Sequence, residues 1–356
     1  MVGRPRPEVA AVAGYVPGKA AEAVAQETGR SDVVKLASNE RSAPPEASLV
    51  AAMSAAAGTT NRYPDNRAMS LRGRLAADLG VDVDTIAVSS GSVGLLHQIT
   101  AAYAGPGRDV LFPWRSFELY PIFSQLSGAN TVTTPLTADW AFDVDALVAA
   151  VTPDTTLVNL ATPNNPTGSA LDRAQLEQIL AAVDEDVIVV VDEAYREYLD
   201  DEPWDPVELV ATHPNVVHLR TFSKAYALAA ARVGWCHGHP EVIAAIHATQ
   251  PPFPVTAMGL AAAEAALDAV DELAAHVTDV RSERARVIAA LVAAGWAVPT
   301  GQQGNFVWIP IPDALDVTAA LERQGVIVRP FAGEGIRVTI GEGWENDRFL
   351  DALATI

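Results

Sequence analysis

The chain has 356 residues, 49% of them apolar, and a formal net charge of −20 at pH 7. This length is sufficient for a large domain with a smaller one beside it. The acidic balance argues against a nucleic-acid partner, because phosphate backbones attract basic surfaces and repel acidic ones.

No apolar run approaches the roughly 20 residues that span a bilayer. Prolines and Glu8 interrupt the first residues, where a signal peptide needs an unbroken apolar stretch. We therefore expect a cytoplasmic protein with no membrane partner, and the single cysteine, Cys236, fits a reducing compartment.

Short apolar runs alternate with helical patterns between about residues 85 and 235. The runs predict strands at 85–89, 109–112, 156–160, 187–191, 216–219 and 233–237. Several are continuously apolar, which is typical of strands that are covered on both faces. Residues 172–183 have a helical period, and Asp172 and Gln175 have the spacing of a capping box. The pattern predicts an α/β fold with a mostly parallel sheet and helices on both faces.

The pattern changes after residue 257. Residues 258–294 predict a long, alanine-rich helical region that ends before Gly295, since glycine favours the position after a helix end. Strands at 305–309 and 335–340 and helices at 317–324 and 346–354 predict a smaller α+β domain. We therefore divide the chain into an N-terminal arm with part of the small domain (1–40), a large domain (41–257), and a linking helix with the C-terminal small domain (258–356).

Polar or aromatic residues follow five of the predicted strands, at 90–94, 114–117, 164–168, 192–195 and 221–224. Each segment alone has an ordinary structural explanation. Ser90-Gly91-Ser92 suits a helix cap, 164–168 suits a turn, and Lys224 resembles a surface cation. However, ligands of an open parallel sheet bind outside the carboxyl ends of its strands. Five such segments at one edge therefore predict a ligand site, and the lack of G-x-G-x-x-G spacing argues against a dinucleotide.

The residue types in these segments suit a small, anionic, aromatic cofactor. A lysine amine forms a Schiff base with an aldehyde, and burial or a nearby cation makes the amine nucleophilic by lowering its pKa. Lysine occurs only at positions 19, 35 and 224. A carboxylate opposite a pyridine nitrogen keeps that nitrogen protonated, so that the ring withdraws electrons. The residues that suit a phosphate are Ser92, Thr221, Ser223, Arg232 and the amides after Gly91.

The same segments resemble the signatures of fold-type I aminotransferases. Residues 221–226 (Thr-Phe-Ser-Lys-Ala-Tyr), with Arg232 eight residues after the lysine, resemble the lysine signature. Residues 164–168 and 192–195 resemble the other two signatures, in the expected order. Further segments resemble the histidinol-phosphate aminotransferase branch, at 15–19, 35–40, 61–65, 328–330 and 335–339. Residues 113–121 resemble the actinobacterial aromatic amino acid aminotransferases of this branch, and the resemblance runs from about residue 8 to the C-terminus.

The resemblance implies pyridoxal 5'-phosphate as the cofactor, with no metal. Lys224 is expected to hold the cofactor and, once freed by the substrate, to move the Cα proton. Asp192 is expected to pair with the ring nitrogen, and Phe117, where the family often has tyrosine, to stack on the ring. Asn165 and Tyr195 are expected to donate to the phenolic oxygen. The phosphate is expected to bind Ser92, the amide of Val93, Thr221, Ser223, Arg232 and Tyr63 of a second subunit, which implies a homodimer.

The resemblance also implies a substrate site. Two substrates are candidates for it. Arg337 is expected to bind the α-carboxylate, and the other expected substrate contacts are Arg329, Tyr15 and Asn39. We predict transamination between an aromatic amino acid, phenylalanine first, and a 2-oxo acid such as 2-oxoglutarate. Histidinol phosphate is the alternative substrate. Less favoured alternatives are a decarboxylase or lyase on the same fold and a non-catalytic cofactor-binding regulator. After Asn39-Glu40 the family usually continues with Asn-Pro, whereas residues 41–44 of this chain are Arg-Ser-Ala-Pro. This loop lies near the substrate in the family, so Arg41 adds a cation there.

Overall fold

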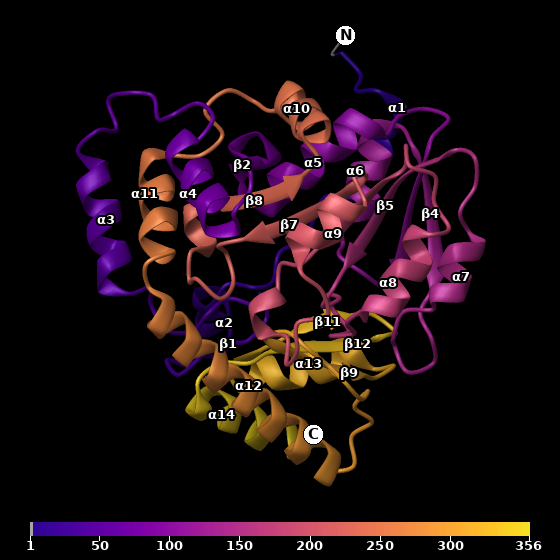
Figure 1. Cartoon of the computed structure of the whole chain (residues 1–356). Helices are drawn as coiled ribbons and strands as arrows, with labels where there is room; N and C mark the ends of the chain where they lie inside the picture. The colour runs from indigo at the N-terminus through magenta and orange to yellow at the C-terminus, as the bar shows by residue number, and fades with distance from the viewer. Residues whose placement is uncertain (1–2) are drawn as a thin grey trace.

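A seven-stranded sheet forms the centre of the larger part of the molecule in the computed structural model, which describes residues 3–356 (Figure 1). The strand order is β2-β8-β7-β6-β5-β3-β4. Only β8 runs antiparallel to its neighbours, and the other adjacent strands are parallel. The strands are β2 (Ile86–Ser90), β3 (Asp109–Trp114), β4 (Asn130–Pro135), β5 (Thr155–Ala161), β6 (Ile188–Asp192), β7 (Val216–Thr221) and β8 (Val233–Gly238). The predicted mostly parallel sheet is thus confirmed.

Both faces of this sheet are covered by helices, as the continuous apolar runs predicted. In β6, Ile188 and Val190 pack into the core on one face, and Val189 and Val191 pack into the core on the other. Helices α5 (Gly91–Tyr103) and α10 (Pro240–Thr249) bury apolar residues against the first face. The second face is covered by α7 (Val144–Ala149), α8 (Arg173–Leu180) and α9 (Pro206–Thr212). Helix α6 (Leu119–Ser127) follows β3 and contributes Tyr120 to the first core.

The predicted long helix at 258–294 is two helices, α11 (Ala257–Ala266) and α12 (Val270–Ala293). Helix α11 packs with α3 (Ala47–Ala57) and α4 (Met69–Leu79) beside β2 and β8. Helix α12 then descends along the smaller part of the molecule (Figure 1). Gly295 follows the end of α12 with a φ of 87°, a conformation that glycine adopts without steric cost.

The smaller part is built from a three-stranded antiparallel sheet and helices. Its strands are β9 (Phe306–Pro310), β11 (Arg329–Phe331) and the central β12 (Gly335–Thr339). Helices α13 (Ala314–Arg323) and α14 (Gly343–Leu353) pack against it. The N-terminal segment includes α1 (Pro7–Ala11) and α2 (Ala21–Thr28), and its strand β1 (Val34–Lys35) pairs in parallel with β10 (Val326–Ile327). The predicted smaller α+β unit is confirmed.

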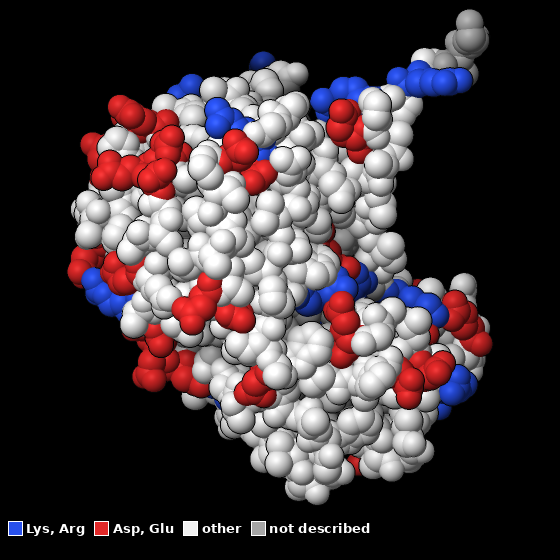
Figure 2. Space-filling view, turned by 90° about the vertical axis from the view of Figure 1, so that its right-hand side faces the viewer, with Lys and Arg blue, Asp and Glu red and all other residues white. Residues whose placement is uncertain are grey.

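Acidic side chains are spread over the face of the molecule in Figure 2 rather than gathered into one patch. This distribution agrees with the net charge of −20. Within residues 3–356, none of the helices combines the length and the apolar character needed to cross a membrane.

Candidate active site

A cavity of about 310 Å³ lies where the carboxyl ends of the sheet strands face the smaller part of the molecule. All five polar segments predicted from the sequence contribute residues to its wall. The predicted site residues that line it are Tyr15, Ser92, Val93, Phe117, Asn165, Asp192, Tyr195, Thr221, Ser223, Lys224, Arg232 and Arg337. Residues more than 300 positions apart thus meet in one cavity, because the ends of β2, β3, β5, β6 and β7 converge at one edge of the sheet.

Lys224 follows β7, and its Nζ donates a hydrogen bond to the backbone oxygen of Ser38 at 3.1 Å. Its ammonium lies 5.7 Å from the ring centre of Tyr195. The pKa of Lys224 is lowered from 10.5 to about 7, mainly by removal from water and also by the positive charge of Arg337, whereas Glu40 acts in the opposite direction. A lysine with such a pKa is partly unprotonated near neutral pH, and it is therefore available as a nucleophile.

Asp192 is the last residue of β6 and lies buried in the wall of the cavity. Its Oδ2 accepts a hydrogen bond from the Tyr120 hydroxyl at 3.0 Å, and its Oδ1 accepts one from the amide of Ala194 at 3.2 Å. Burial raises the pKa of Asp192 from 3.8 to about 6, although both hydrogen bonds oppose this change. A cation placed beside the carboxylate would stabilise its charged form.

The start of α5 and the turn after β7 form an end of the cavity that suits an anion. Ser90 precedes α5 without a capping bond from its side chain to any residue of 3–356, and Ser92 and Val93 of the first turn line the cavity, where a helix start favours an anion. The hydroxyl of Thr221 donates to Ser223 Oγ at 2.9 Å, and Arg232 Nη1 lies 3.4 Å from the same Oγ. Arg232 has a left-handed φ of 57°, a conformation that costs energy for a non-glycine residue and is frequent at functional sites.

Arg337 on β12 contributes a buried cation to the cavity. Its Nη1 donates to Asn165 Oδ1, and its Nη2 donates to the backbone oxygen of Ala37 at 2.6 Å. Its Nε has no hydrogen-bond partner among residues 3–356. Because the Arg337 guanidinium lines the cavity and keeps its positive charge, it suits contact with an anionic ligand.

Three predicted residues lie outside the lining of this cavity. Asn39 is buried behind it and donates through Nδ2 to the Tyr195 hydroxyl at 2.9 Å. Arg329 is buried beside Tyr15 and paired with Glu118. Tyr63 is 82% exposed and stacks on Phe253, with ring centres 4.4 Å apart.

The structure adds residues that the sequence analysis did not assign to the site. Tyr120 fixes Asp192, and its ring packs edge-on against Phe117. Ser38 and Glu40 line the cavity. Glu40 and Tyr120 stand within segments used for the family resemblance, but nothing in their spacing indicated these contacts.

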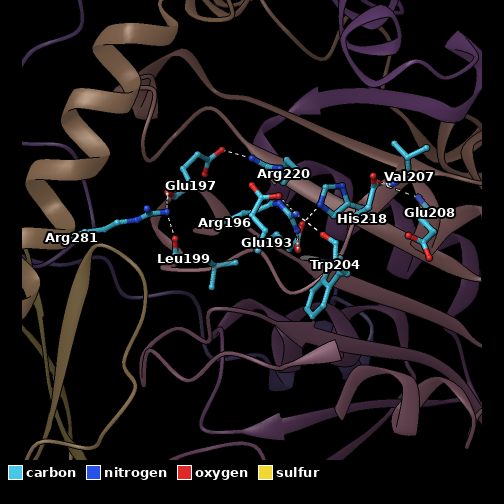
Figure 3. Close-up of polar contacts among 12 residues, drawn as sticks. Glu193, Arg196, Glu197, Leu199, Trp204, Val207, Glu208, His218, Arg220 and Arg281 are labelled. Carbon is cyan, nitrogen blue, oxygen red and sulfur yellow. Dashed lines mark hydrogen bonds and ion pairs between the residues drawn. The ribbon is translucent and has the colours of Figure 1, made fainter. Parts of the chain in front are cut away.

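A network of largely buried polar side chains begins at Glu193, the residue after β6 (Figure 3). The carboxylate of Glu193 accepts one hydrogen bond from Arg196 Nη1 at 2.6 Å and contacts the His218 ring nitrogen. Burial lowers the pKa of His218 well below 6.5, so its imidazole is neutral. Arg196 also donates to the backbone oxygen of Trp204 at 2.8 Å. These contacts hold the chain just after β6, and thereby the ring of Tyr195, in a fixed position.

Together these features describe an enzyme site with a nucleophilic lysine, a buried carboxylate and an anion-binding end. A family model described as aminotransferase class I and II matches residues 31–353. The chain therefore belongs to the class I and II aminotransferases, which depend on pyridoxal 5'-phosphate. The residues present fit this cofactor, because the α5 start suits its phosphate, Asp192 its ring nitrogen and Lys224 its aldehyde. The predicted family and cofactor are confirmed.

Individual relatives agree with this assignment over nearly the whole chain. An aromatic amino acid aminotransferase from Thermobifida fusca is 47% identical over 343 residues, which are 96% of this chain and 94% of that protein. One from Streptomyces coelicolor is 46% identical over 347 residues, 97% of this chain and 95% of that protein. The crystal structure of a histidinol-phosphate aminotransferase from Sinorhizobium meliloti in complex with pyridoxal-5'-phosphate has a TM-score of 0.90 and 29% identity, covering 100% of this chain and 98% of that one.

Proposed function

We propose that this aminotransferase moves the amino group of an aromatic L-amino acid, phenylalanine first, to a 2-oxo acid such as 2-oxoglutarate. The observation that carries this proposal is that Lys224, Asp192 and Arg337 line one cavity. Bound pyridoxal phosphate supplies the electron sink of the reaction. The relatives named aromatic amino acid aminotransferases support the substrate class.

In this proposal Lys224 carries the cofactor and afterwards serves as the base. With the cofactor bound, the free amine of Lys224 would take the proton from the substrate Cα and pass it to the cofactor side, so that the amino group would stay with the cofactor and the substrate would leave as its 2-oxo acid. Its lowered pKa of about 7 supports this role, because a general base is most effective when its pKa lies near the working pH. Asp192 would keep a proton on the ring nitrogen of the bound cofactor, and Tyr120 holds the carboxylate in place.

The other roles are distributed between the cofactor and the substrate. Phe117 would pack on the cofactor ring, and Asn165 and Tyr195 would hold its phenolic oxygen; all three residues line the cavity. The phosphate is held by Ser92, Val93, Thr221, Ser223 and Arg232. Arg337 binds the α-carboxylate, and its position as a buried cation in the cavity wall supports this role. Tyr15 closes the substrate side of the cavity, while Asn39 and Arg329 act from behind its lining.

The aromatic preference is supported by the apolar groups beside the cavity. Phe117 and Tyr15 line it, and the buried Phe331 lies next to Arg329. Burial of a phenyl ring against such groups stabilises a complex by roughly 1.5–3 kcal/mol. Histidinol phosphate remains the second candidate, because Arg329 and Arg337 are directly paired residues of β11 and β12, and two adjacent arginines suit a phosphate.

The two candidates are separated by kcat/KM for phenylalanine and for histidinol phosphate, with 2-oxoglutarate as the acceptor in both assays. We predict a preference of about tenfold or more for phenylalanine, equivalent to ~1.4 kcal/mol of differential transition-state binding. An equal or greater preference for histidinol phosphate would assign the second function instead.

We also propose that the active enzyme is a homodimer in which Tyr63 reaches the cofactor phosphate of the partner subunit. Tyr63 is an aromatic residue that is 82% exposed in the single chain and does not line its own cavity. Contact with a second copy would remove this apolar surface from water. A cytoplasmic location stays a prediction, consistent with the buried free thiol of Cys236.

A further inference from the structure

We propose that Glu118 determines the charge of the substrates that the site accepts. By neutralising Arg329, Glu118 restricts the substrate-binding end to a monoanionic carboxylate and disfavours a phosphate dianion. This inference rests on the proposed function, since it explains how an amino acid is preferred over a phosphorylated amine at the same site.

The ion pair lies directly behind the arginine that lines the cavity. Arg329 and Arg337 are directly opposite each other on the antiparallel strands β11 and β12, so their side chains extend from the same face of the sheet. Arg329 Nη2 donates to Glu118 Oε2 at 2.7 Å, and its guanidinium lies 5.8 Å from the ring centre of Tyr15 in the cavity wall. Glu118 comes from the start of α6 in the larger part, so the pair forms only when the chain is folded.

Both members of the pair act electrostatically on the cavity. Burial is the main cause that lowers the pKa of Arg337, Arg329 lowers it further, and Glu118 opposes this change. The field at Arg337 therefore includes one additional cation, Arg329, and one anion, Glu118. Removal of the anion alone would leave two neighbouring arginines uncompensated.

The two candidate substrates differ in the negative charge of the group that would bind near Arg329 and Arg337. Two arginines and one glutamate leave a single net positive charge, which matches the single negative charge of an α-carboxylate. A phosphate monoester carries a charge of about −1.5 to −2 at neutral pH. Its second charge would find Arg329 already paired and would lie near the Glu118 carboxylate. Such an unfavourable charge contact disfavours the wrong substrate, and specificity often depends on contacts of this kind.

A second ion pair at the same boundary provides a matched control. Arg115 donates to both carboxylate oxygens of Glu334, with distances of 2.6 and 2.9 Å. Glu334 has a side-chain exposure of 29%, close to the 32% of Glu118. Its partner Arg115 does not line the cavity, and it is not a strand neighbour of Arg337. Glu334→Gln therefore removes one negative charge from an equivalent environment without freeing Arg329.

The test uses the holoenzyme and its Glu118→Gln and Glu334→Gln variants. Glu118 is the residue before α6, but its side chain makes no capping bond to any residue of 3–356, so glutamine leaves the helix start intact. Two measurements are made on each protein. One is kcat/KM for phenylalanine and for histidinol phosphate. The other is the Kd of two unreactive ligands, 3-phenylpropanoate and 2-phenylethyl phosphate, which differ mainly in their anionic group.

We expect Glu118→Gln to raise the ratio of kcat/KM for histidinol phosphate to that for phenylalanine by about tenfold or more, mainly through KM. The affinity for 2-phenylethyl phosphate should rise by a similar factor, and that for 3-phenylpropanoate by much less. Glu334→Gln should change neither ratio by more than about twofold, because Glu334 is paired with Arg115 and its removal leaves the Arg329–Glu118 pair intact.

The two proposals fail in different ways. If the wild-type enzyme prefers histidinol phosphate, the proposed function is wrong, and the two unreactive ligands still decide the role of Glu118. If Glu118→Gln leaves the relative Kd of these ligands unchanged, or if Glu334→Gln changes it equally, the assignment to Glu118 is wrong. Turnover of whichever substrate the wild-type enzyme prefers verifies that each variant is folded.

Discussion

Asp192 lies at the end of β6 in surroundings that favour a bound cation. Burial raises its pKa to about 6, and a protonated ring nitrogen beside it would stabilise the carboxylate. We predict that Asp192→Asn retains the cofactor but loses at least about two orders of magnitude in kcat/KM, because the ring nitrogen loses its counter-ion. Asp172→Asn at the start of α8 is the control, since asparagine also caps helices. Near-normal turnover of Asp192→Asn would mean that the carboxylate has only a structural role.

The sequence predicted the residues of this site better than it predicted their partners. Lys224, Asp192 and Arg337 were recognisable because their segments follow strands or match family signatures. The bond from Tyr120 to Asp192 joins residues 72 positions apart, and the Arg329–Glu118 pair joins residues 211 positions apart. Such pairings depend on how α6 and β11 pack in the folded molecule, and no local pattern encodes them. The division at residues 40 and 257 stays a prediction.

At the scale of elements, the close packing of β8 on the start of α5 shapes the anion-binding end. A Cβ atom on Gly234 would lie 2.2 Å from the amide nitrogen of Ser92, so β8 and α5 must separate to accommodate it. We predict that Gly234→Ala destabilises the protein by about 1–3 kcal/mol and weakens binding of pyridoxal phosphate. Gly73→Ala within α4 is the control, because no atom lies within 4 Å of its added Cβ. That variant should be more stable by about 0.4–1 kcal/mol.

Denaturant unfolding of the apo-protein and titration with the cofactor measure the two effects of Gly234→Ala. Unchanged cofactor affinity in this variant would show that the α5 start does not hold the phosphate.

There are physical reasons why some elements were predicted from the sequence and others were missed. The six predicted strands of the central sheet agree with the structure to within two residues, because buried parallel strands are continuously apolar. The edge strand β4 was missed, since most of its residues are exposed and its sequence is rich in threonine. Strands β1, β10 and β11 have two or three residues each, too few for a periodic pattern. The break between α11 and α12 falls in a stretch whose alanines favour helix on both sides.

At the scale of the whole molecule, the proposed dimer makes a prediction about shared sites. Tyr63→Phe and Lys224→Ala homodimers should each be impaired, the second severely. If Tyr63 acts on the partner subunit, an equal mixture after subunit exchange contains sites that carry neither mutation, roughly a quarter of the total. Activity should therefore exceed the sum of the two parents. Exchange is verified with differently tagged chains, and no gain after verified exchange would mean that Tyr63 serves its own chain or no site.

The central claim is that Lys224 is the residue that holds pyridoxal phosphate. Borohydride reduction of the holoenzyme followed by peptide mapping tests it most directly, because the chain has only two other lysines. Lys19 is paired with Glu27 and Glu322, which raise its pKa, and Lys35 is paired with Glu40. We predict that the pyridoxyl group is recovered on Lys224 alone and is lost in Lys224→Ala. Recovery of the group on Lys19 or Lys35, or on no lysine, would contradict the account.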